Sequence, residues 1–153
     1  MGIKQVTPDS VIRKAMEDDM RRMRVLVIRQ LSAVGEQAVN EARMSHTYRD
    51  QTGNLTSSIG YAVFDNGEQA EMGEFNPVPA PNGDGSQGSL TGREFAEALS
   101  LQFPTGIVLV VVAGMKYAKY VAAKGYNVLD SSYTLARDLV PVLLKELMED
   151  IAS

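Results

Sequence analysis

Few residues of this chain could carry out chemistry, and their spacing favours structural roles. His46 is the only histidine and there is no cysteine, so a histidine metal cluster and a cysteine nucleophile are both excluded. A serine triad would have to recruit His46 with Ser45 or a distant serine, and no spacing supports that arrangement. We therefore interpret His46 as a solvated residue at a helix end and expect no enzyme activity and no cofactor.

One polar segment begins like a calcium-binding loop, at Asn82-x-Asp84-x-Ser86. Its sixth position is Gln87, where a glycine is needed for the turn, and its twelfth is Arg93, where a bidentate glutamate is needed. The segment therefore does not match a calcium site and is interpreted as a polar loop.

The charged clusters also lack catalytic partners. The acidic groups at residues 17–19 and 146–150 have no accompanying acid–base motif, and solvated helix faces are the favoured interpretation. A basic section of the first predicted helix holds four arginines, namely Arg21, Arg22, Arg24 and Arg29. They could contact DNA phosphates without reading sequence. The alternative is that they pair with nearby acids or with an acidic neighbouring subunit.

The composition is that of one globular domain covering residues 1–153. The chain is 44% hydrophobic and 22% charged, which argues against wholesale disorder. The net charge of −4 indicates by itself neither a nucleic-acid nor a membrane partner. The acidic first twenty residues predict no signal peptide, and the longest apolar run, residues 107–113, is too short to span a membrane. We expect a cytoplasmic domain.

A long amphipathic helix is predicted from Ser10 to a point between Met44 and Tyr48, capped by Asp9 or Ser10. Its apolar stripe, with steps of three or four, is Ile12, Met16, Met20, Met23, Val27, Leu31, Val34, Ala38 and Ala42. At about 1.5 Å per residue such a helix is longer than the hydrophobic core of one small domain. We expect part of it to cross a sheet and part to serve a neighbouring subunit. For the three methionines, core packing is favoured over an adaptable groove.

The remaining pattern predicts an α+β fold, with this helix and a C-terminal helix packed on a small, mainly antiparallel sheet. Residues 58–64 alternate like a half-buried strand, and residues 69–75 give a weaker strand signal. Residues 107–113 have no polar face and predict a central strand covered on both sides. The C-terminal helix runs from Asp130 to Ile151, and Pro141 either kinks it or begins a separate segment.

A long insert occupies residues 66–105. Prolines and glycines make residues 76–90 a flexible loop without packed structure. Thr91 and Glu94 then match a capping box that starts a short helix through Leu101. Its expected buried side chains are Phe95, Ala98 and Leu99. Long insertions in compact domains usually serve a function, so we interpret this one as an assembly loop.

Two motifs flank the insert. The first is the turn Thr52-Gly53-Asn54-Leu55, and the second is Gly114 followed by Tyr117-Ala118-x-Tyr120-Val121. In this order, between two amphipathic helices, they resemble the head–tail joining or tail-completion (neck) proteins of tailed bacteriophages. The family pattern continues with a glutamate where this chain has Ala122, and its usual members lack or shorten the insert. Residues 117–124 by themselves suit either a strand or a helical turn.

The resemblance implies a structural virion protein of the neck or upper tail, assembled in the host cytoplasm. Identical subunits would form a ring of six or twelve around the DNA channel, between portal or adaptor proteins and tail proteins, with non-specific DNA contact in the lumen as a further option. The candidate subunit interface is Tyr117, Tyr120, Val121 and Tyr126, although the first two tyrosines could instead cover the core. The alternatives are a tail terminator, a nucleic-acid-binding module using the four arginines, and a small enzyme with an unrecognised site.

Overall fold

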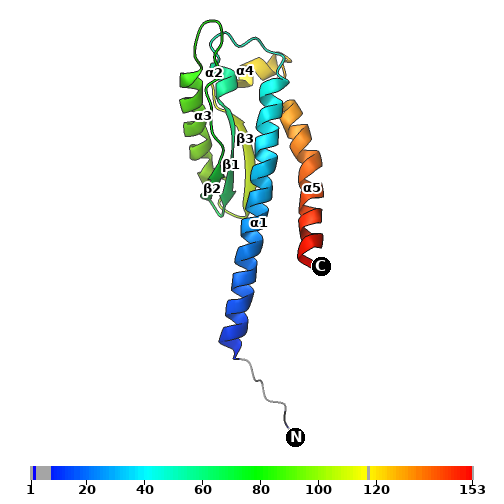
Figure 1. Cartoon of the computed structure of the whole chain (residues 1–153). Helices are drawn as coiled ribbons and strands as arrows, with labels where there is room; N and C mark the ends of the chain where they lie inside the picture. The colour runs from blue at the N-terminus through cyan, green and yellow to red at the C-terminus, as the bar shows by residue number, and fades with distance from the viewer. Residues whose placement is uncertain (1, 3–7, 117, 153) are drawn as a thin grey trace.

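Helices cover both faces of a three-stranded sheet in the computed structural model, which describes residues 2, 8–116 and 118–152, without the side chains at positions 119 and 120 (Figure 1). The helices are α1 Asp9–Met44, α2 Asn54–Ser57, α3 Ser86–Ala98, α4 Ala118–Ala123 and α5 Asp130–Ala152, with a 3₁₀ turn at Leu99–Gln102. The strands are β1 Ile59–Asp65, β2 Glu68–Met72 and β3 Ile107–Ala113. This arrangement confirms the expected α+β class.

The sheet has the strand order β2-β1-β3, and both neighbours run antiparallel to β1. β1 is therefore the central strand and is buried on both faces, so the expectation of a half-buried strand at residues 58–64 is wrong. The expectation that residues 107–113 form a central strand is also wrong, because β3 lies at an edge and is mostly half-buried. An apolar strand sequence indicates that both faces of the strand are apolar. It does not indicate whether the strand has a neighbour on one edge or on both.

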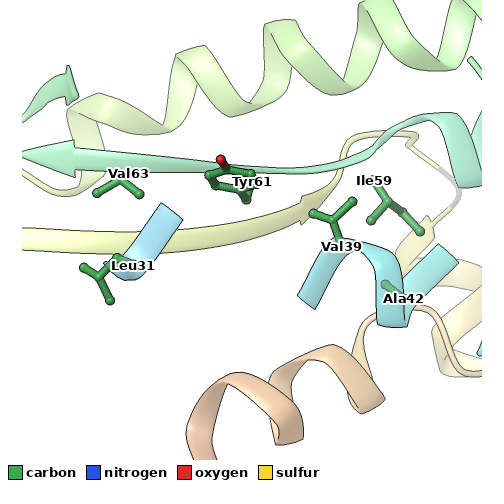
Figure 2. Packing of buried hydrophobic residues seen from close by; sticks show 6 residues of the cluster. All are labelled: Leu31, Val39, Ala42, Ile59, Tyr61 and Val63. Carbon is green, nitrogen blue, oxygen red and sulfur yellow. The ribbon is translucent and has the colours of Figure 1, made fainter. Parts of the chain in front are cut away.

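Each face of β1 contributes to its own hydrophobic cluster. On one face, Ile59, Tyr61 and Val63 pack against Leu31, Val39 and Ala42 of α1 (Figure 2). On the other face, Ala62 and Phe64 pack with residues from α3, β3 and the segment after β2, which are Ala96, Val112 and Phe75. The sheet is thus held between α1 and α3, while α5 packs along α1.

The predicted first helix is confirmed as α1, but its two halves differ. It starts at Asp9 after Pro8 without a side-chain cap, so the expected cap at Asp9 or Ser10 is wrong. The half from Leu31 onward is buried on the sheet side. The other half extends beyond the sheet (Figure 1), and Met16 and Met20 are 60% and 61% exposed. The expectation that these methionines pack in the core is therefore wrong within one chain.

α3 begins at Ser86, five residues before the expected capping box, and Thr91 lies inside the helix. Phe95 and Ala98 are exposed, so their expected burial is wrong, whereas Leu99 is half-buried and packs against the cluster around Phe64. The buried positions are Gly88, Gly92 and Ala96. These small residues face inward because α3 lies directly on the backbone of Asn54 and Ser58, where a side chain would collide.

The C-terminal part contains two helices. Residues 118–123 form α4, so a helical turn and not a strand follows Gly114. α5 is one continuous helix with Pro141 inside it, and no separate last segment begins there.

Candidate functional site

The two motifs that carry the family resemblance lie together at one end of the sheet, where α2 and α4 are neighbours (Figure 1). Leu55 of the first motif shares a hydrophobic cluster with Ala118 and Val121 of the second. The Gly114 N–H also donates to the Ser58 carbonyl oxygen at 3.2 Å. We call this region, residues 48–58 with 114–128, the motif junction.

Side-chain hydrogen bonds fix the turn of the first motif. Asp50 accepts from the Gly53 N–H at 3.0 Å and, through its other oxygen, from the Thr56 N–H at 2.8 Å. The Tyr48 hydroxyl lies 3.0 Å from Thr56 Oγ1, and Asn54 Oδ1 accepts from the Gly88 N–H at 3.0 Å. The sequence interpretation missed Asp50, although an aspartate just before a glycine turn is typical of such caps.

The two motif glycines are required for different reasons. Gly53 has φ +78°, and a Cβ there would lie 1.9 Å from the Val78 carbonyl oxygen. Gly114 is not among the described glycines with a positive φ. Its added Cβ would instead lie 2.5 Å from the Cα of Gly92 in α3. Gly114 is thus needed for close packing between β3 and α3.

The loop of the insert that precedes α3 is hydrogen-bonded to the motif junction. Ser57 Oγ accepts from the Val78 N–H at 2.7 Å, and the Asn82 N–H donates to the Gln51 carbonyl oxygen at 2.8 Å. Residues 76–85 are therefore tied to the first motif, and residues 86–90 belong to α3. The expectation that residues 76–90 lack packed structure is wrong.

The four candidate interface residues are placed only in part. Tyr117 lies outside the described residues, and Tyr120 belongs to α4 while its side chain is outside the description. Val121 is half-buried against the motif-junction cluster. Tyr126 is 45% exposed and remains accessible to a partner.

Three of the four candidate DNA-facing arginines pair with carboxylates of the same chain. Arg21 lies 3.1 Å from Asp18, three residues before it, and Arg22 pairs in the same way with Asp19. Arg24 pairs with Asp65 at the end of β1, and this hydrogen bond raises the pKa of Arg24. Arg29 is exposed. The pairs offset much of the positive charge of the basic section.

The other polar candidates have structural partners. His46 is half-buried, stacks on Tyr48 with ring centroids 4.3 Å apart, and places Nδ1 3.0 Å from the Tyr48 carbonyl oxygen. It is therefore not the solvated residue that was expected. Asp84 accepts from the Ser86 N–H at 2.9 Å, and this bond lowers the pKa of Asp84. Across the described ranges, no three histidine, aspartate or glutamate side chains cluster as metal ligands would.

The chain also has two apolar surfaces that could contact a partner. The first is the exposed part of the α1 stripe, which we call the α1 ridge: Ile12, Met16, Met20 and Met23. The second, which we call the α5 groove, is a cavity of about 660 Å³ among α1, β3 and α5. Its walls include Val27, Leu31, Leu109, Val111, Ala136 and Val140. Of the helices that the structure describes, none is both long and apolar enough to cross a membrane.

Comparison of the chain with protein-family models, with curated protein sequences and with solved structures gives no match.

Proposed function

We propose that this protein is a structural subunit of a bacteriophage neck, a head–tail connector or tail-completion protein that acts as a ring. The observation that supports this proposal best is the motif junction. The two resemblance motifs are far apart in the sequence, yet they pack on each other through Leu55, Ala118 and Val121.

The exposed apolar surfaces fit a subunit of a larger assembly. Monomeric proteins rarely expose large contiguous apolar patches, and such patches commonly mark interaction sites. The α1 ridge and the α5 groove are different surfaces of the same chain. When one patch meets a different patch on the next copy, the contacts generate a ring if the rotation closes.

The proposed mechanism is mechanical. The ring docks on the portal side, receives the tail, and leaves a lumen for DNA. The motif junction supplies a rigid end to each subunit, because the Asp50 carboxylate and the Asn54 amide oxygen hold the turn and α3 in place.

The test is the mass of the purified protein by size-exclusion chromatography with light scattering, followed by negative-stain imaging. We expect closed rings of six or twelve copies, formed alone or on purified portal complexes. A protein that stays monomeric up to about millimolar concentration and forms no ring on portal complexes would contradict the proposal.

A further inference from the structure

We propose that the α5 groove of one copy receives the α1 ridge of a second copy. This inference deepens the proposed function, on which it rests for the expectation that copies assemble. It assigns the two contact surfaces, and it identifies the occupant of the groove as residues 12–23 of another chain.

The groove is incomplete in a single copy. α5 packs along α1 and stands away from β3, which leaves Leu109 and Val111 half-buried beside the cavity. Of the groove-lining residues within the described chain, only Arg137 is charged. Hydrophobic grooves are sites that accept the apolar face of an amphipathic helix.

The unpaired edge of β3 also indicates that a second copy covers this part of the chain. The Gly114 N–H donates to the Ser58 carbonyl oxygen, and the Asn66 N–H donates to the Gly106 carbonyl oxygen. In the register of β1 with β3, the even-numbered residues of β3 therefore form the hydrogen-bonded pairs. Hydrogen-bonded pairs alternate along an antiparallel ladder, and Leu109 and Val111 therefore direct their peptide groups away from β1. An apolar strand edge is an aggregation hazard, and a covering helix is one of the ways in which proteins protect it.

The α1 ridge has the form that the groove requires. Its side chains recur every three or four residues, the spacing of anchors in helix-in-groove recognition. Three of the four are methionines, which adapt to irregular apolar surfaces. The exposed fractions of Ile12, Met16, Met20 and Met23 run from 42% to 61%, so all four are available to a partner.

A single chain cannot bring ridge and groove together. The groove is lined by Val27 and Leu31 of the same continuous helix that carries the ridge. Met16 lies about 22 Å along the axis from Leu31 at about 1.5 Å per residue, and the ridge half extends beyond the sheet (Figure 1). Mutual burial therefore requires a second copy.

Charge favours the same pairing. Asp19 borders the ridge because it lies one turn before Met23 and about 40° from it around the helix, and Arg137 lines the groove. Among the described residues, Asp19 pairs with the exposed Arg22 and Arg137 pairs with the exposed Asp138, both close in sequence. Exposed pairs of this kind contribute little, so Asp19 and Arg137 can exchange partners when the ridge enters the groove.

Disulfide trapping tests the contact directly, because the chain has no cysteine of its own. Met16→Cys or Met20→Cys in one preparation is mixed with Ala136→Cys in another and oxidised. We expect mixed disulfide-linked dimers well above those formed by the control, Val11→Cys, which is similarly exposed but lies about 140° around α1 from Met16. If neither methionine position exceeds the Val11→Cys control, the proposal is overturned.

A second measurement uses charge instead of a cross-link. Met20→Glu is expected to weaken self-association by at least about tenfold. Val11→Glu adds the same charge at an exposed apolar residue on the opposite side of α1 and should change self-association less than about twofold. Both substitutions lie outside the core clusters, so thermal unfolding should confirm intact folds. Equal effects of the two variants would overturn the assignment.

Light scattering then separates this inference from the proposed function. Cross-linking together with a ring of six or twelve supports both. If the variants cross-link but the protein has the mass of a dimer, the contact is supported and the ring is contradicted. In such a dimer each copy places its α1 ridge in the α5 groove of the other, so the assembly closes with two copies. A ring without the cross-link supports the function and overturns the assigned surfaces.

Discussion

At the scale of single residues, the motif junction depends on Gly53. The Gly53→Ala variant combines an unfavourable positive φ, which costs about 1–2 kcal/mol for a residue with a Cβ, with a collision against the Val78 carbonyl oxygen. We expect a loss of about 3 kcal/mol in the free energy of unfolding, measured by urea denaturation.

Gly106 provides the matched control for this prediction. Its φ of +79° is nearly the same, but nothing lies within 4 Å of an added Cβ. Gly106→Ala should therefore cost only the conformational term of about 1–2 kcal/mol. Equal losses for the two variants would show that the close approach at Val78 is unimportant.

Tyr61 makes stability depend on pH in the alkaline range. Burial raises the pKa of Tyr61 to about 12, and the charges of Glu36 and Glu71 act in the same direction. The unfolded chain loses this proton at about pH 10 while the folded chain keeps it. The stability contributed by the neutral Tyr61 hydroxyl is therefore complete below pH 10 and is lost as the pH rises to about 12.

The Tyr61→Phe variant isolates this effect because it keeps the ring that packs beside α1. At pH 7 it should lie within about 1 kcal/mol of the parent chain. Between pH 10 and 12 its unfolding free energy should fall less steeply, by urea denaturation in matched buffers. Parallel curves for the two proteins would contradict the assignment.

At the scale of elements, Pro141 opposes the helix that contains it. A proline inside a helix removes one hydrogen bond and costs about 3 kcal/mol relative to alanine, and it lies within α5. We expect Pro141→Ala to raise the free energy of unfolding by about 1–2 kcal/mol, since proline also restricts the unfolded chain. Thermal unfolding of Pro141→Ala beside the exposed Val142→Ala variant provides the comparison, and a destabilised Pro141→Ala would show that α5 needs the proline.

Local patterns in the sequence were sufficient to predict α1, β1 and α5, because their signals are periodic and do not depend on distant residues. These local patterns gave wrong predictions where contacts between distant segments determine the structure. α3 begins before Thr91 because Gly88 and Gly92 pack on the backbone near Asn54 and Ser58. The edge position of β3 could not be foreseen either, since strand order depends on pairings between distant segments.

The candidate site was predictable to a similar extent. The motif residues Thr52–Leu55 and Gly114 were identified in advance, but their contact with each other, the cap from Asp50 and the α5 groove were not. Each of these features joins segments that are separated by other elements. The exposure of the methionines could not be foreseen from periodicity, because a stripe looks the same whether its partner is this chain or another copy.

At the scale of the whole molecule, electrostatics predicts weak DNA binding. The net charge is −4, and Asp18, Asp19 and Asp65 already pair with three arginines of the basic section. We expect a dissociation constant weaker than about 10⁻⁴ M for duplex DNA at physiological salt, the weak end of non-specific binding. Fluorescence anisotropy at two salt concentrations measures both affinity and salt dependence.

Removing one of these carboxylates should change that behaviour in a defined way. Asp18→Asn frees Arg21, and one added phosphate contact steepens the slope of log affinity against log salt by about 0.9. Asp18 lies on the side of α1 away from the ridge, at about 100° per residue, so assembly should be unaffected. Glu146→Gln changes the net charge equally but lies on α5 and should leave the slope as it is. If both variants bind alike, net charge alone governs the interaction and the basic section of α1 does not face the DNA.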